Sequence, residues 1–104
     1  MKGNGTVTGM ITSRSVQVRI SGNVQGCAYR DWTEKNAHLL GLAGWVRNRK
    51  DGSVEAMFAG PDTSVSEMIS RCKEGPQSAE VETVDILKEG CGRFSDEFDI
   101  LPTA

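Results

Sequence analysis

The sequence predicts an α+β protein of the ferredoxin-like type, in which a four-stranded antiparallel sheet carries two helices on one face. Apolar residues alternate with a period of two in several short stretches and recur at helical spacing in two longer ones. These stretches follow one another in the order β-α-β-β-α-β. Because right-handed crossovers make the two strands joined by each helix parallel, with room for one strand between them, this order gives the split βαβ arrangement.

The first strand and the first helix have the clearest patterns. Apolar and polar residues alternate over 16–20, which predicts a half-buried strand. Helical spacing begins at Tyr29, and Gly41 is a typical residue to end the helix. The face predicted to be buried is formed by Tyr29, Thr33, Ala37 and Leu40.

A hairpin is predicted in the middle of the chain. Strands over 43–49 and 54–59 flank Asp51-Gly52, a pair favoured in tight hairpin turns. In a four-stranded sheet of this type, the strand over 43–49 lies at the edge. A last main strand is predicted over 81–88, and the tail beyond it forms either a short edge strand or a segment across one end of the sheet, through Phe94, Phe98 and Ile100.

The second helix carries its apolar residues at i, i+3, i+4 and i+7, and Gly75-Pro76 ends it. Its start has two alternatives. Pro61 suits a first helical turn, whereas Ser64 with Glu67 would form a capping box.

Length and composition define the class of protein. The 104 residues, 38% hydrophobic and 25% charged, suffice for one domain, which we expect over 14–104. The Gly- and Thr-rich residues 1–13 are interpreted as a flexible tail, because they lack the apolar stretch of a secretory signal. No apolar run approaches the roughly 18 residues of a membrane span. We therefore expect a cytoplasmic monomer with no membrane association.

Charge is unevenly distributed along the chain. Residues 1–50 carry eight basic and two acidic residues, and residues 51–104 carry four basic and twelve acidic ones. The basic half suits a local anion site, unless the two halves interleave in the fold and their charges average out. With a net charge of −2, the chain lacks the basic footprint of a nucleic-acid-binding domain.

Cysteine and histidine usage excludes several metal and disulfide chemistries. The cysteines are odd in number and have no C-x-x-C spacing, so neither a disulfide framework nor a zinc ribbon is expected from Cys27, Cys72 and Cys91. His38 is the single histidine. Three unpaired thiols suit a reducing compartment. For Cys27, the alternatives are an oxidation-sensitive thiol and a small apolar filler.

The glycine-containing loop before the first helix is the candidate binding site. Backbone N–H groups at a helix N-terminus lack internal partners, and the helix dipole favours an anion there. Arg30 stands where a cation is unfavourable unless an anion joins it, and its guanidinium can bind two phosphate oxygens. The alternative is a plain surface turn, with Arg30 paired to Asp31 or Glu34. Neither a Walker A loop nor a dinucleotide fingerprint is present.

Several segments carry a family resemblance. They are Val16-Gln17-Val18-Arg19-Ile20-Ser21-Gly22-Asn23-Val24-Gln25-Gly26-Cys27-Ala28-Tyr29-Arg30, Leu40-Gly41-Leu42-Ala43-Gly44-Trp45-Val46-Arg47-Asn48, Asp51-Gly52-Ser53-Val54-Glu55, the later Gly75-Pro76 with Ala79 and Val81, and Phe98 with Ile100. In order and spacing, residues 15–101 resemble the acylphosphatase family.

The resemblance implies the ferredoxin-like fold and the hydrolysis of acyl phosphates to a carboxylate and inorganic phosphate, without metal or cofactor. It implies that Arg30 binds the phosphate and that Asn48 holds the attacking water. From the residues alone, Asn48 would instead begin the hairpin turn. The backbone phosphate cradle implied by the resemblance comprises Asn23, Val24, Gln25, Gly26, Cys27, Ala28 and Tyr29.

Two departures concern the loop. The family usually has Val-Gly where this chain has Cys27-Ala28, so Ala28 is strained if its position needs a positive φ. Tyr29 replaces the commoner Phe and needs a partner for its hydroxyl.

Two functions are therefore compared. The first is an acyl phosphate hydrolase. Its substrate is activated from the start, so positioning and charge stabilisation suffice. The alternative is a non-catalytic anion-binding or partner-docking module on the same scaffold.

Overall fold

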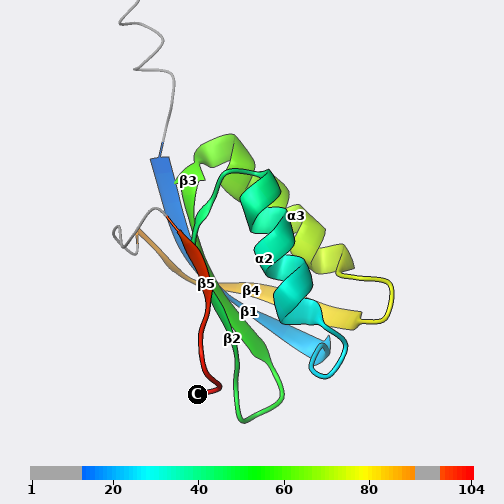
Figure 1. Ribbon diagram of the computed structural model, residues 1–104. Helices are drawn as coiled ribbons and strands as arrows, with labels where there is room; N and C mark the ends of the chain where they lie inside the picture. Colours follow the sequence, from blue (N-terminus) through cyan, green and yellow to red (C-terminus); the bar gives the residue numbers. More distant parts are fainter. Residues whose placement is uncertain (1–12, 91–96) are drawn as a thin grey trace, which may run out of the picture.

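A computed structural model describes residues 13–90 and 97–104 and confirms the ferredoxin-like fold, with two helices on one face of a sheet (Figure 1). The strand order is β4-β1-β3-β2-β5. The elements are β1 (Ser13–Asn23), α2 (Tyr29–Leu39), β2 (Ala43–Asn48), β3 (Val54–Pro61), α3 (Asp62–Glu74), β4 (Glu80–Glu89) and β5 (Phe98–Ile100).

The sheet has one face buried under the helices and one open face. Val16, Val18 and Ile20 of β1 are fully buried, and the residues between them, Gln17 and Arg19, point to the open face. Because side chains alternate along a strand, this pattern fixes the register as well as the side. The period-two prediction for 16–20 is confirmed, and the strand extends beyond it at both ends.

The two helices bury most of the faces that their spacing predicts. Tyr29, Thr33 and Ala37 are the buried residues of α2, and α3 buries Val65, Met68 and Cys72. Leu40, predicted on the buried face, is the C-cap residue of α2 and is only partly buried, because the helix ends before it. Of the two alternatives for the start of α3, the earlier one is observed. Pro61 is the N-cap residue, and α3 has no side-chain cap hydrogen bond.

The predicted sheet of four antiparallel strands needs one correction. β5 adds a fifth strand, parallel to β2, so β2 is not at the edge. Phe98 is buried and stacks on Phe58 at 5.8 Å between ring centroids. Beyond β5, the Leu101 N–H donates to the Val46 carbonyl at 2.9 Å. The tail is therefore the short edge strand of the two alternatives. Phe94 and Cys91 lie outside the described residues.

The basic and acidic halves of the chain interleave in the sheet. β1, from the basic half, lies between β4 and β3 of the acidic half. Residues 1–12 of the predicted tail lie outside the described residues, and Ser13 begins β1. Across the described part of the chain, neither helix has the length and apolar character needed to cross a bilayer.

Candidate active site

The loop joining β1 to α2 has a left-handed backbone at two positions. Gly26 has φ 76°, and Ala28, the N-cap residue of α2, has φ 61° and ψ 27°. Ala28 is the single non-glycine residue with positive φ in the described part of the chain. Ala28 therefore meets the condition under which the sequence predicts strain, a positive φ. An L-residue in this conformation costs about 1 kcal/mol.

This backbone leaves a run of N–H groups without partners. The N–H groups of residues 25–31 donate no hydrogen bond to any described residue, and α2 has no side-chain cap. The run leads into the positive end of the helix dipole. Successive N–H groups near left-handed residues form the concave nests that bind anions. The loop therefore has the donors that a phosphate group requires.

Arg30 lies beside these donors in the first turn of α2. Its side chain is half-buried and forms no hydrogen bond or ion pair with the described residues. The alternative in which Arg30 pairs with Asp31 or Glu34 is therefore not observed. A guanidinium held without a counter-charge at the positive end of a helix is electrostatically unfavourable until an anion binds.

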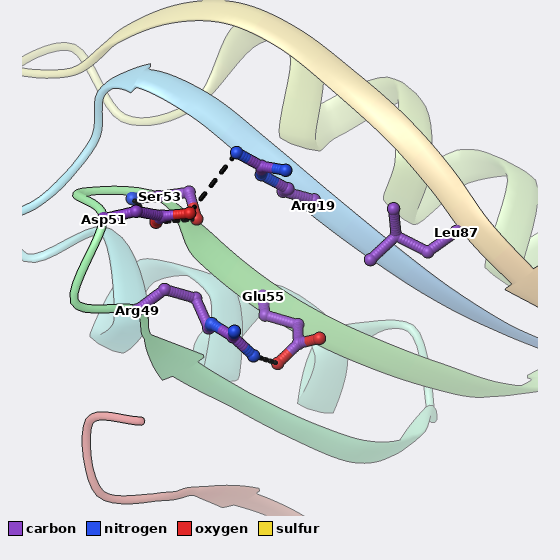
Figure 2. A pocket seen from close by; sticks show the side chains of 6 residues that line it. All are labelled: Arg19, Arg49, Asp51, Ser53, Glu55 and Leu87. Atoms are coloured by element: carbon purple, nitrogen blue, oxygen red, sulfur yellow. Dashed lines mark hydrogen bonds and ion pairs between the residues drawn. The ribbon is translucent and has the colours of Figure 1, made fainter.

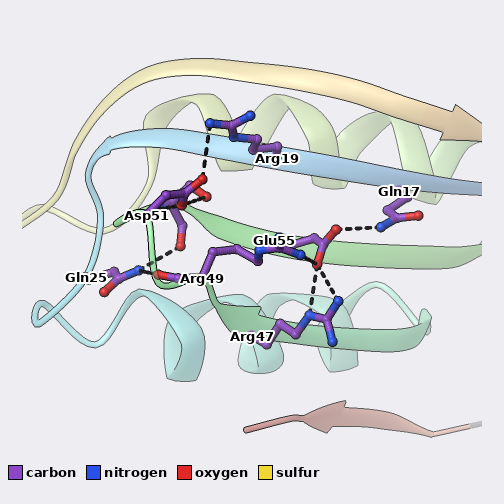
Figure 3. Close-up of polar contacts among 8 residues, drawn as sticks. Gln17, Arg19, Gln25, Arg47, Arg49, Asp51 and Glu55 are labelled. Atoms are coloured by element: carbon purple, nitrogen blue, oxygen red, sulfur yellow. Dashed lines mark hydrogen bonds and ion pairs between the residues drawn. The ribbon is translucent and has the colours of Figure 1, made fainter. Parts of the chain in front are cut away.

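Side chains fasten the loop to the rest of the fold at three points. Gln25 Nε2 donates to the Arg49 carbonyl at 2.7 Å and to the Ser53 carbonyl at 2.8 Å (Figure 3). On the other side, Ser78 Oγ donates to the Cys27 carbonyl at 3.2 Å. The third contact is the Tyr29 hydroxyl, which donates to the Cys72 carbonyl at 2.8 Å.

Burial raises the pKa values of two groups behind the loop, the Tyr29 phenol and the Cys72 thiol. Burial, with the neighbouring Cys72, raises the pKa of Tyr29 far above its ordinary value, so the phenol stays neutral. Burial also raises the pKa of the Cys72 thiol to about 12. The Tyr29 hydroxyl thus has the partner that its buried position requires. The Cys27 side chain is partly buried against the core.

Asn48 is the last residue of β2, next to the loop. Its Oδ1 atom is buried and has no hydrogen-bond partner among the described residues. The turn that follows is held instead by Asp51, whose Oδ1 accepts from the N–H of Ser53 at 2.9 Å and from its hydroxyl at 2.6 Å. Asn48 therefore does not hold the turn through its side chain. A buried, unbonded carboxamide oxygen is unusual and is satisfied by a bound water or ligand.

The loop and the end of β2 form one site, because Gln25 binds the hairpin on both sides of its turn. The Arg49 carbonyl that accepts from Gln25 follows directly after Asn48. The structure thus brings the predicted loop beside Asn48, with Arg30 at the start of the helix that the loop enters. The side chain of Gln25, predicted as part of the phosphate cradle, points to the hairpin.

A polar cluster on the open face of the sheet was missed by sequence reasoning. Glu55 is only 6% exposed and accepts hydrogen bonds from three side chains, those of Gln17, Arg47 and Arg49 (Figure 3). Burial acts to raise the pKa of Glu55, but the hydrogen bonds from Arg47, Gln17 and Arg49 outweigh it and lower the pKa. The hairpin register, which the structure supplies, places Arg47 directly opposite Glu55.

A pocket of about 110 Å³ lies beside this cluster, on the open face and away from the helices (Figure 2). Its two cations, Arg19 and Arg49, already pair with Asp51 and Glu55. The described residues contain no group of three or more His, Cys, Asp or Glu arranged to hold a metal ion. Among the described residues, the arginines of this pocket are thus paired, whereas Arg30 beside the loop is not.

Comparisons with known proteins identify the family of the chain. The acylphosphatase family model matches residues 16–100. An acylphosphatase from Nitrobacter hamburgensis is 55% identical over 92 residues, which cover 84% of this chain and 93% of that protein. Among solved structures, the acylphosphatase from Coxiella burnetii has a TM-score of 0.81 at 31% identity, covering 86% of this chain and 93% of that one. The Bacillus subtilis acylphosphatase has a TM-score of 0.78 at 27% identity, with 86% and 99% covered.

The fold is that of a ferredoxin-like domain, and the loop at the start of its first helix is its candidate anion site. The family model and the relatives make the class specific. The chain belongs to the acylphosphatase family. The family predicted from the sequence, and with it the class of enzyme, is confirmed.

Proposed function

We propose that the backbone of residues 23–29 and the guanidinium of Arg30 hold the phosphoryl group of an acyl phosphate, while Asn48 positions the attacking water. As a member of its family, the chain is a hydrolase that cleaves acyl phosphates to a carboxylate and inorganic phosphate. The assignment of roles to these residues is the new part of the proposal.

The observation that carries the proposal is the run of unpaired backbone N–H groups over residues 25–31, with the guanidinium of Arg30 beside it. A phosphoryl group in transfer spreads its charge over three equatorial oxygens. The N–H groups of residues 25–31 and the guanidinium of Arg30, all without partners among the described residues, are the donors available to these oxygens. Because these donors are fixed before the substrate binds, they stabilise the transition state without reorganisation.

The proposed role of Asn48 is to place the attacking water. The carboxylate leaving group needs no proton, and a loose transition state requires little deprotonation of the water. The water must therefore be placed in line with the breaking bond more than activated. Asn48 Oδ1, buried and unbonded, accepts a hydrogen bond from that water, and a phosphoryl oxygen of the substrate takes its proton.

The other expectations form part of the same proposal. We propose a cytoplasmic monomer that acts on a small acyl phosphate, releases inorganic phosphate and needs neither metal nor cofactor. No role with nucleic acid or membrane is assigned. The alternative, a non-catalytic anion-binding or partner-docking module, is not favoured, because the relatives that match most of the chain are named as enzymes.

Hydrolysis of benzoyl phosphate in EDTA, with inorganic phosphate as a competitor, tests the proposal. We expect full turnover in the chelator and competitive inhibition by phosphate, since substrate and product share the loop. Turnover that needs an added divalent cation would contradict the metal-independent mechanism. Phosphate binding without turnover would favour the docking module.

A further inference from the structure

We infer that Glu55 is a positioning residue for hydrolysis: from the open face of the sheet it holds Arg47 and Arg49, and through them it fixes Asn48. The inference rests on the proposed role of Asn48. Glu55 is not part of the proposed phosphate site, because it lies on the face of the sheet opposite the helices (Figure 3).

The contacts of Glu55 converge on the two residues that flank Asn48. Its Oε1 atom accepts from Arg47 Nε at 2.8 Å and from Arg49 Nη1 at 3.1 Å. The other carboxylate oxygen, Oε2, accepts from Gln17 Nε2 at 2.6 Å, so the carboxylate is itself held from β1. Arg47 lies on β2 and Arg49 directly follows the strand, and both side chains reach Glu55 on the open face. Because side chains alternate along a strand, Asn48, the residue after Arg47, points to the opposite face.

Burial of the Glu55 carboxylate keeps its contacts with the two arginines in a fixed geometry. The Glu55 side chain is 8% exposed, and those of Arg47 and Arg49 are 28% and 41% exposed. A charge-assisted pair shielded from water holds its geometry better than an exposed pair. The Arg47 guanidinium also lies 4.9 Å from the centre of the Trp45 ring, which further limits its movement. The end of β2 is therefore fixed on its open face by a carboxylate, as it is fixed at its turn by Gln25.

The proposed reaction requires that the side chain of Asn48 be held in a fixed direction. The Oδ1 atom of Asn48 has no hydrogen-bond partner in the described part of the chain to orient it. Its direction is therefore set by the backbone of β2, and the backbone is set by the side chains on either side. Small errors in the placement of a reacting group lower the rate steeply, by up to about 100-fold for 1 Å.

The test compares Glu55→Gln with the intact enzyme at a temperature well below the unfolding midpoint of both. The substitution keeps the shape of the side chain and removes its charge. We expect kcat for benzoyl phosphate to fall about tenfold. The inhibition constant of inorganic phosphate should stay within about twofold, because phosphate is held by the loop and Arg30. Glu55→Asp, which keeps the charge, should recover part of the lost turnover.

The decisive arm repeats Glu55→Gln in an Asn48→Ala background. If Glu55 acts through Asn48, the second substitution lowers kcat little further, because the group being positioned is gone. A loss of the same size in both backgrounds would overturn the inference and leave a structural role only. If Asn48→Ala alone keeps full activity, the proposed function of Asn48 fails instead, so the two failures are distinguishable.

Two further variants keep the test interpretable. Glu89→Gln removes a carboxylate that pairs with Arg14 at the far end of β1, and it should leave both constants unchanged. If Glu55→Gln does not fold, Arg49→Gln breaks one partly exposed contact of the same carboxylate. Unchanged kcat in a folded Arg49→Gln variant would then count against the inference.

Discussion

The two strand-to-helix junctions in the described part of the chain join the same types of element but differ in backbone conformation. α3 follows β3 directly, with Pro61 in an ordinary extended conformation (φ −59°, ψ 142°). α2 follows β1 through a loop with two left-handed residues, Gly26 and Ala28. Both helices lack a side-chain cap and carry an aspartate in the first turn. A helix N-terminus alone therefore does not make the site.

The charged residues at the two junctions complete the contrast. At α3, Asp62 lies 3.4 Å from Arg14, so its charge is partly balanced. At α2, Arg30 has no such partner in the described part of the chain. The loop proposed to bind phosphate is therefore distinguished from the α3 junction by its left-handed backbone and by a cation without a partner among the described residues.

The largest effect is expected from Arg30→Ala, which removes the cation of the α2 junction. Activity should fall by a factor on the order of 10³, because the charge on the equatorial oxygens loses its strongest partner. Inhibition by phosphate should be lost with it. Steady-state kinetics with benzoyl phosphate measures both.

The matched controls for Arg30→Ala lie nearby and at the other junction. Lys35→Ala removes an exposed cation of α2, and Asp62→Asn neutralises the charge at α3. Neither should change turnover or phosphate inhibition. A similar loss in Lys35→Ala would mean that the overall potential, and not the guanidinium contact, is responsible.

The next effect is expected from Asn48→Ala. We expect kcat to fall on the order of 100-fold, because the water is no longer aimed, with phosphate inhibition largely intact. Steady-state kinetics measures the loss in kcat, and isothermal titration calorimetry with phosphate measures phosphate binding separately. Full activity in this variant would show that the buried Oδ1 atom has no role in the reaction.

A smaller effect is expected from Gln25→Ala, which releases the loop from the hairpin. Two hydrogen bonds to the Arg49 and Ser53 carbonyls are lost, so the loop and Asn48 no longer share a fixed spacing. We expect kcat to fall about tenfold. Gln77→Ala, at an exposed position of the α3–β4 connection, is the control and should be silent. Equal kinetics in both variants would argue against the contact between loop and hairpin.

The smallest effect, and one of opposite sign, is expected from Ala28→Gly. Glycine adopts φ 61° without the strain that alanine has there, so the free energy of unfolding should rise by about 1 kcal/mol. Thermal unfolding measures this as a midpoint several degrees higher. Ala43→Gly, in a strand at ordinary φ, should lower the midpoint. A lower midpoint for both would show that Ala28 is unstrained.

The elements with periodic patterns were predictable, and those that depend on pairing between distant segments were not. The alternation at Val16, Val18 and Ile20 is a local signal, and so is the Asp-Gly turn. By contrast, β5 has three residues and is defined by pairing with β2, so no pattern within it revealed that the pairing is parallel.

The site was predictable in part for the same reason. The loop, Arg30 and Asn48 stand in contiguous motifs, and the family pattern pointed to Ala28 as a residue that is strained if its φ is positive. The direction of the Gln25 side chain and the cluster around Glu55 did not follow, because both depend on which residues face each other across strands. No pattern within the sequence shows that Arg47 and Arg49 both pair with a buried carboxylate.

Titration of the backbone amides with inorganic phosphate, followed by nitrogen–proton NMR, tests the central claim most directly. We expect saturable shifts concentrated in residues 25–31, with the Arg30 side-chain resonances moving at the same phosphate concentration. Shifts centred instead on the first turn of α3, or on Arg19 and Arg49 at the open-face pocket, would contradict the account.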